Sequence, residues 1–124
     1  EVTIECEVDF LKLSSYGDAK ISSGDVRLLK DLNCQVEGRD IIIVEDIVDS
    51  GLSMEYIRNL IGRQNPKSFK IVTLLYKKES VKTPITIDYV GFSIPKDFVI
   101  GYGLDYAQRM RNLKSIYKLT EKSK

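Results

Sequence analysis

Carboxylates, hydroxyls and a glycine gather in one short stretch of this chain. The members of the set are Glu45, Asp46, Asp49, Ser50, Gly51 and Ser53. Hydroxyl groups and main-chain N–H groups at the start of a helix bind anions, because the helix dipole places partial positive charge at that end. A glycine lets a ligand approach the main chain closely, since it has no side chain. The stretch therefore predicts an anion-binding turn with carboxylates beside it.

A buried strand and a helix are expected to hold this turn in place. Ile41–Val44 is an unbroken run of β-branched residues, which is typical of a strand buried on both faces of a parallel sheet. Glu45 and Asp46 follow it, and a helical pattern of apolar residues begins at Met54. In open α/β sheets, ligands bind beyond the carboxyl ends of the strands. The predicted strand, turn and helix thus place the chemistry at that edge.

Further segments carry the patterns of strands and of one long loop. The alternation of apolar and polar residues from Val2 to Phe10 predicts a strand with one buried face. Phe69–Tyr76 predicts a second apolar strand, which runs parallel to the strand at Ile41–Val44 and is joined to it by the predicted helix. Shorter strands are predicted at Val26–Leu29, Ile87–Phe92 and Ser115–Leu119. The polar stretch Ser14–Asp25 predicts a long mobile loop, and such loops in compact domains often act as lids.

Composition is that of an ordinary globular domain. The chain has 124 residues, of which 43% are hydrophobic and 30% charged, with a formal net charge of +1. This length suits a single domain with a real core. No apolar run approaches the roughly 18 residues that a membrane helix needs, which excludes membrane insertion. Because the net charge is close to zero, a broad nucleic-acid surface is not expected, and attraction for phosphate must come from local arrangement.

The chain contains two cysteines and no histidine. Cys6 and Cys34 fit neither a metal-ligand spacing nor a disulfide framework, which favours a reducing cytoplasm. The absence of histidine removes Ser-His-Asp and Cys-His chemistry. Proton transfer would therefore fall to carboxylates, lysine or tyrosine.

Several motifs, taken in chain order, resemble those of one enzyme family. They lie at residues 9–16, 44–53, 74–78, 88–95 and 98–106. The 44–53 motif resembles the phosphoribosyl pyrophosphate motif of the purine phosphoribosyltransferases, in the hypoxanthine-guanine branch. The resemblance covers essentially the whole chain. It implies an α/β fold with a Rossmann-like parallel-sheet core and a flexible lid loop.

The resemblance also implies a reaction and its partners. The reaction would transfer the 5-phosphoribosyl group of phosphoribosyl pyrophosphate to N9 of hypoxanthine or guanine, with Mg²⁺, in cytoplasmic purine salvage. Cleavage of the bond to pyrophosphate develops positive charge on the ribose, so catalysis would consist mostly of electrostatic positioning. The implied assembly is a homodimer or homotetramer. A preference among hypoxanthine, guanine and xanthine is not implied.

Roles at the central turn follow from the same resemblance. Glu45 and Asp46 match the acids that hold the ribose hydroxyls. The phosphate-binding positions match Asp49, Ser50, Gly51, Leu52 and Ser53. Asp49 also matches the acid beside N7 of the purine, which accepts or donates a proton. An alternative for Ser50 or Ser53 is that the hydroxyl simply caps the helix.

Roles elsewhere in the chain are implied in the same way. Lys77 matches the donor to the exocyclic O6, while Phe98 matches the ring that stacks on the base and Val99 the main chain that reads the base edge. Asp105 matches the magnesium carboxylate and Arg111 the arginine on pyrophosphate. Ser15 and Tyr16 match the tip of the lid. The alternative for Phe98 is a core aromatic residue.

Members of the family carry a longer N-terminal part, including a loop that grips pyrophosphate. We therefore expect residues 1–124 to form a single phosphoribosyltransferase domain that is incomplete at its N-terminus. Its strands should leave unpaired edges and exposed apolar surface. Either a further segment accompanies the chain or it is a poor catalyst alone. Two functional alternatives stay open: a nucleotide-sensing regulatory module that binds nucleic acid, and an inert fragment.

Overall fold

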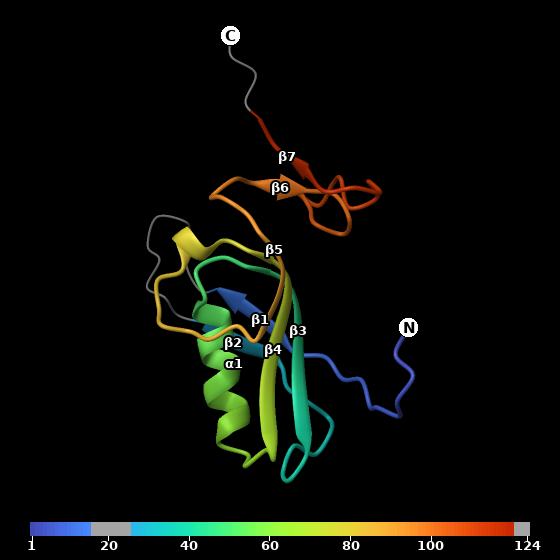
Figure 1. Ribbon diagram of the computed structural model, residues 1–124, viewed down its shortest axis with the longest axis vertical. Helices are drawn as coiled ribbons and strands as arrows, with labels where there is room; N and C mark the ends of the chain where they lie inside the picture. The colour runs from blue at the N-terminus through green and yellow to red at the C-terminus, as the bar shows by residue number, and fades with distance from the viewer. Residues whose placement is uncertain (16–25, 121–124) are drawn as a thin grey trace. The chain divides into compact units, whose positions relative to one another are not determined.

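The computed structural model describes residues 1–15 and 26–120. The chain divides into two compact units, residues 1–93 and 94–124, and each is described by itself. The elements of both are labelled in Figure 1. Within the described residues, no helix has the length and apolar character needed to cross a membrane.

A parallel sheet and one helix form the centre of the first unit. The strands are β3 (Asp40–Val48), β4 (Ser68–Tyr76) and β5 (Tyr89–Ser93), in the order β3-β4-β5, and both neighbouring pairs are parallel. Helix α1 (Leu52–Gly62) connects β3 to β4 and lies along the sheet (Figure 1). This arrangement confirms the predicted α/β fold with a parallel sheet, and β4 matches its predicted range closely.

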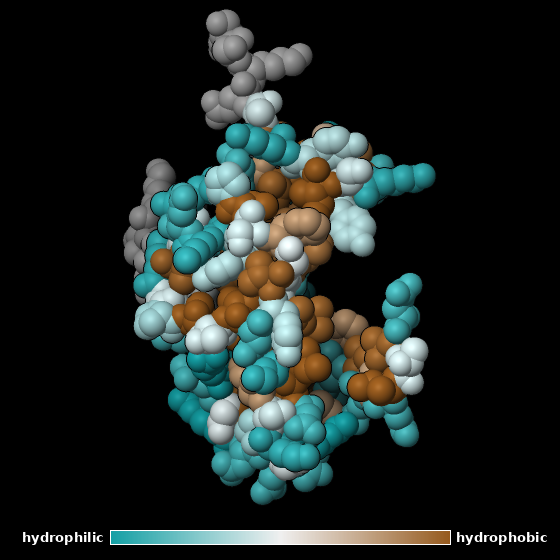
Figure 2. All heavy atoms as spheres, in the orientation of Figure 1, coloured by the Kyte–Doolittle hydropathy of each residue, from teal (hydrophilic) through white to brown (hydrophobic). Residues whose placement is uncertain are grey.

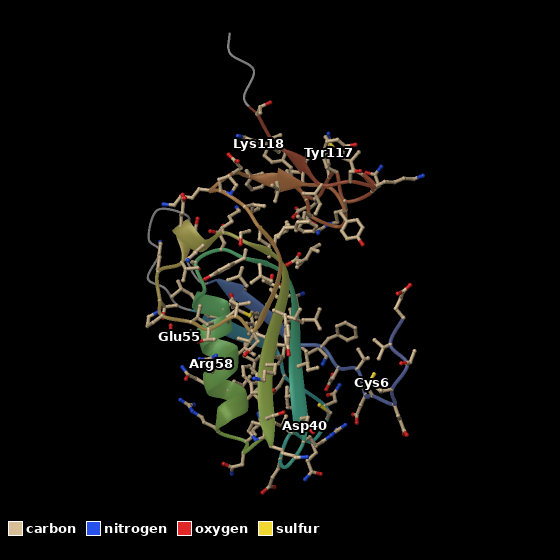
Figure 3. All side chains as sticks on the ribbon, viewed as in Figure 1. Cys6, Asp40, Glu55, Arg58, Tyr117 and Lys118 are labelled. Carbon is tan, nitrogen blue, oxygen red and sulfur yellow. The ribbon has the colours of Figure 1, made fainter. Side chains whose placement is uncertain are left out.

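The core lies between α1 and one face of this sheet. The helix contributes Met54, Ile57 and Ile61, which recur at helical spacing and are buried. They pack with Val48 and Ile71 of the strands in one hydrophobic cluster. Arg58 lies on α1 (Figure 3) and donates a hydrogen bond from Nη2 to the carbonyl oxygen of Thr86 (3.2 Å). The helix is therefore fixed both to the sheet and to the segment that leads into β5.

The predicted central strand differs from the observed one in two ways. Strand β3 continues to Val48, so Glu45 and Asp46 lie inside the strand and do not follow it. The expectation of burial on both faces is wrong, because Ile42 is 64% exposed and Val44 is 80% exposed. Among the described residues, the helix covers one face only. Hydrophobic residues are accordingly visible over the sheet in Figure 2, which confirms the predicted exposed apolar surface.

An antiparallel pair precedes the central sheet. Strands β1 (Lys12–Ser15) and β2 (Val26–Lys30) pair with each other, which confirms the predicted strand at Val26–Leu29. The predicted strand from Val2 to Phe10 is wrong: the first eleven residues form no strand. The reason is the lack of a pairing partner among the described residues, and the apolar side chains of this segment, such as Val8, are exposed.

Asp9 attaches this extended segment to the rest of the unit. Its carboxylate accepts hydrogen bonds from the main-chain N–H groups of Phe10, Asn33 and Cys34 at 2.7–2.9 Å. These hydrogen bonds, that of Cys34 first, hold the pKa of Asp9 well below its usual range. Cys6 and Cys34 are both free thiols.

The second unit contains a small antiparallel pair. Strands β6 (Val99–Ile100) and β7 (Tyr117–Lys118) pair through Val99 with Lys118 and Ile100 with Tyr117. Strand β7 lies within the predicted Ser115–Leu119.

A single turn of 3-10 helix, η1 (Lys78–Ser80), follows β4 in the first unit. Strand β5 begins two residues later than predicted.

Gly91 on β5 should tolerate no side chain. A Cβ built there lies 2.7 Å from the carbonyl oxygen of Leu74, which is main chain and cannot turn away. We expect Gly91→Ala to lower the free energy of unfolding by about 1–3 kcal/mol, measured in urea. Gly62→Ala is the matched control, because nothing lies within 4 Å of a Cβ at that position. Equal effects of the two substitutions would contradict the assigned close approach.

Candidate active site

The turn between β3 and α1 forms an open helix N-terminus. Gly51 is the N-cap residue, with φ of 82° and ψ of −6°, a left-handed conformation that favours glycine. Its carbonyl oxygen accepts the first helical hydrogen bond, from the N–H of Glu55 (2.9 Å). The helix has no side-chain cap, although Ser50 Oγ accepts a long bond from the N–H of Leu52 (3.4 Å). The first N–H groups of α1 are thus available to an anion.

A cavity of about 150 Å³ opens at this turn. It is lined by Glu45, Ile47, Val48, Asp49, Ser50, Gly51, Ser53 and Met54. Most of the phosphate- and ribose-binding positions expected from the sequence therefore surround one space. Leu52 contributes the first residue of the helix and does not line the cavity.

Lys77 meets Asp49 beside the cavity. Its Nζ lies 3.3 Å from Asp49 Oδ2, and the side chain of Lys77 is only 9% exposed, against 59% for Asp49. The two residues are 28 positions apart in the chain, and the parallel pairing of β3 with β4 brings them together. A buried ammonium group needs a charged partner, and the carboxylate supplies it. The next residue, Lys78, is exposed.

Glu45 and Asp46 are adjacent acids on β3. The N–H of Asp46 donates to Glu45 Oε1 (3.3 Å), and the N–H of Ile47 donates to Asp46 Oδ1 (2.7 Å). Burial, together with hydrogen bonding to Asp46, raises the pKa of Glu45 to about 8. In its protonated form, Glu45 can donate as well as accept a hydrogen bond.

The raised pKa of Glu45 makes the stability of the fold depend on pH. Between the usual value of 4.5 and about 8, the folded state binds the proton that the unfolded state releases, so stability falls as pH rises through this window. We expect Glu45→Gln to flatten that fall, measured as the thermal midpoint from about pH 5 to pH 9. Parallel curves for the variant and the unchanged chain would contradict the assignment.

The second unit carries the other expected residues. Phe98 is 50% exposed, so the alternative that it is a core aromatic residue is wrong. Its ring packs edge to face against the ring of Tyr106, with 5.9 Å between the ring centroids. Asp105 Oδ2 accepts a hydrogen bond from the N–H of Gln108 (2.9 Å). Arg111 Nη2 lies 3.6 Å from Asp105 Oδ1, and Nη1 donates to the carbonyl oxygen of Gly103 (2.9 Å). Arg111 thus stabilises the loop that carries Asp105.

Asp105 fits a magnesium ion only in combination with substrate oxygens. No group of three or more histidine, cysteine or acidic side chains gathers as a metal site in the described part of the chain. Magnesium is commonly held by one or two carboxylates, water and substrate phosphates. A single, partly exposed carboxylate matches that donor set.

Ser15 does not line the cavity, and some residues that make contacts at the site were not predicted. Ser15 ends β1, and Tyr16 lies outside the described residues. Gln108 was missed; its side chain accepts a hydrogen bond from Arg111 Nη2 (3.2 Å). Lys82 was missed as well, and its N–H donates to the carbonyl oxygen of Ser50 (2.9 Å). No sequence signal marks a contact made by the main chain.

Comparison with known proteins gives consistent matches. Residues 2–107 match the family described as phosphoribosyl transferase domain. The hypoxanthine-guanine phosphoribosyltransferase of Bacillus subtilis is 54% identical over 110 residues, which are 89% of this chain and 61% of the relative. A solved hypoxanthine phosphoribosyltransferase from Staphylococcus aureus is 42% identical with a TM-score of 0.84, over 90% of this chain and 61% of that one. The solved structure of a hypoxanthine phosphoribosyltransferase variant from Trypanosoma cruzi, in a ternary substrates complex, is 42% identical with a TM-score of 0.87. The match covers 95% of this chain and 63% of that one. The chain therefore spans about three fifths of the length of these relatives.

Proposed function

Since the chain belongs to the phosphoribosyl transferase domain family, we propose that it transfers the 5-phosphoribosyl group of phosphoribosyl pyrophosphate to N9 of hypoxanthine or guanine. The products would be inosine or guanosine monophosphate and pyrophosphate, in purine salvage. One observation carries this proposal: the uncapped start of α1 and the Asp49–Lys77 pair both lie at the carboxyl ends of β3 and β4. The names of the relatives support it.

The 5′-phosphate would bind at the turn from Asp49 to Ser53. The N–H groups of the first helical turn and the hydroxyls of Ser50 and Ser53 are donors, and the helix dipole favours the negative charge. Cavity-lining Gly51 keeps the main chain accessible. Glu45 and Asp46 would hold the ribose hydroxyls from β3. A carboxylate beside the ribose also stabilises the positive charge that develops on it.

The base would bind beside Asp49 and Lys77. In this proposal the Asp49 carboxylate hydrogen-bonds the proton at N7, and Lys77 donates to the exocyclic O6. A donor at that position favours 6-oxopurines over adenine, whose amino group is itself a donor. Phe98 would stack on the base, and the main chain of Val99 would read its far edge. The half-exposed ring of Phe98 is compatible with stacking.

Pyrophosphate would be held by Arg111 and by a magnesium ion at Asp105. The ion, when bound, would neutralise charge on the leaving pyrophosphate. Arg111 offers forked donors suited to phosphate oxygens, but it must first give up part of its contact with Asp105 and Gln108. Ser15 and Tyr16 would belong to a lid that excludes water from the cation-like ribose.

The proposal extends to the setting of the enzyme. We place it in the cytoplasm as a single phosphoribosyltransferase domain, assembled as a homodimer or homotetramer. The nucleotide-sensing alternative is not proposed, because no contact at the turn favours it and the relatives compared above are named as transferases.

A turnover assay tests this function directly. The chain is incubated with phosphoribosyl pyrophosphate and Mg²⁺, separately with hypoxanthine, guanine, xanthine and adenine, and nucleoside monophosphate is quantified. Product with hypoxanthine or guanine, and none with adenine, is expected. Binding of guanosine monophosphate is measured in parallel by calorimetry, because a chain shorter than its relatives can keep the site and turn over slowly. If the chain shows no turnover and also binds no nucleotide, the proposal is refuted.

A further inference from the structure

The segment after β4 makes two main-chain hydrogen bonds to the turn that carries Asp49. The N–H of Lys77 donates to the carbonyl oxygen of Val48 (3.0 Å), and the N–H of Lys82 donates to that of Ser50 (2.9 Å). The two bonds lie on either side of Asp49 in the sequence. We call residues Lys77–Ile85 the backing segment, which includes η1.

The backing segment also packs directly against Gly51. The position that a Cβ would take on Gly51 lies 3.3–3.4 Å from methyl carbons of Val81, Thr83 and Ile85. Gly51 is buried and also lines the cavity. The glycine is therefore held between methyl groups and the space where an anion would bind.

The hydrogen bond from Lys82 fixes the direction in which a turn amide points. In a trans peptide, the C=O of one residue and the N–H of the next point in opposite directions. The described residues contain no cis peptide bond. Because the carbonyl of Ser50 points to Lys82, the N–H of Gly51 points away from the backing segment. The same reasoning applies to the carbonyl of Val48 and the N–H of Asp49.

We propose that the backing segment positions the phosphate-binding turn, and that the main-chain N–H of Lys82 aims the Gly51 amide at the ligand's phosphate group. The inference rests on the proposed function, because it assigns the supporting element of that same site. Lys82 is a positioning residue that acts through Ser50 and Gly51 and does not touch the ligand. Preorganised donors bind a phosphate more tightly than mobile ones, since no ordering is needed on binding.

A proline at position 82 removes this one donor. Val81 has φ of −66° and ψ of 125°, which suits a residue before proline. The side chain of Lys82 is exposed, so its truncation alone should disturb little packing. The matched pair is therefore Lys82→Pro, without the N–H, and Lys82→Ala, with it. Affinities for guanosine monophosphate and for guanosine are measured by calorimetry, with the thermal midpoint as the check of folding.

We expect Lys82→Pro to bind guanosine monophosphate roughly tenfold more weakly than Lys82→Ala does. Affinity for guanosine should be equal in the two variants, because it lacks the phosphate; a general structural defect would weaken both ligands. If Lys82→Pro does not fold, an ester in place of the amide at Lys82, made by semisynthesis, removes the same donor and decides the question. Equal binding of guanosine monophosphate would overturn this inference alone. Failure of the unchanged chain both to bind guanosine monophosphate and to turn over would instead refute the proposed function.

Discussion

Replacing Asp49 by asparagine is expected to lower kcat/KM for guanine roughly a hundredfold or more. Asparagine keeps the shape of the side chain but loses the charge that would hold a proton at N7 of the base. It also leaves the nearly buried Lys77 ammonium without its charged partner, which lies 3.3 Å away in the unchanged chain. The measurement is steady-state kinetics with phosphoribosyl pyrophosphate and Mg²⁺.

Asp40→Asn provides the control for loss of one negative charge. Asp40 begins the same strand, β3, at the end away from the turn (Figure 3), where its carboxylate accepts a hydrogen bond from the Ser68 hydroxyl (2.6 Å). This variant should turn over like the unchanged chain. If Asp49→Asn stays within about twofold of the control, Asp49 does not have the role assigned to it.

A second large effect is expected when Gly101 is replaced by alanine. Gly101 has φ of +88°, and a Cβ there would overlap the carbonyl oxygen of Ser115 and lie 3.1 Å from the Cβ of Leu113. The main chain of the second unit must therefore shift. We expect a destabilisation of roughly 3–5 kcal/mol, from the strained conformation and the clash together. Amide resonances of residues 94–120 should lose dispersion in NMR spectra.

Gly103→Ala separates the two causes. Gly103 has a similar φ of +92°, but nothing lies within 4 Å of its Cβ position. The free energy of unfolding of this variant should fall only by the conformational cost, roughly 1–2 kcal/mol, and its amide resonances should stay dispersed. Indistinguishable spectra for the two variants would mean that Gly101 does not pack against the Ser115 main chain.

The sequence predicted the centre of the fold because local pattern and tertiary environment agree there. β-branched residues in β3 and β4 and the helical spacing of Met54, Ile57 and Ile61 each favour the element that the structure contains. The glycine and hydroxyls between β3 and α1 likewise predicted the turn. Local pattern was therefore sufficient to predict the type of each element, although residues 77–85, distant in the chain, contact the turn.

Pattern alone failed where a strand depends on what lies beside it. The alternation from Val2 to Phe10 describes how a strand would divide its faces, but no described residue pairs with that segment. The apolar run in β3 suggested two covered faces, whereas Ile42 and Val44 face outwards. Hydrophobicity shows what a face could bury and does not supply the covering element.

The candidate site was only partly readable in advance. Lys77 and Asp49 were singled out by resemblance, and the strand register explains why they meet. Lys82 could not have been found, because it contributes a main-chain N–H that every residue except proline has. Gln108 supports Arg111 through an amide group in a loop with left-handed residues, a geometry without a sequence signature.

The most direct measurement is a crystal structure of this chain with guanosine monophosphate. The phosphate should accept hydrogen bonds from the first N–H groups of α1 and from the Ser50 and Ser53 hydroxyls, with O6 of the base beside Lys77. A ligand bound elsewhere, with the turn from Asp49 to Ser53 free of phosphate, would contradict the assignment of this turn as the nucleotide site.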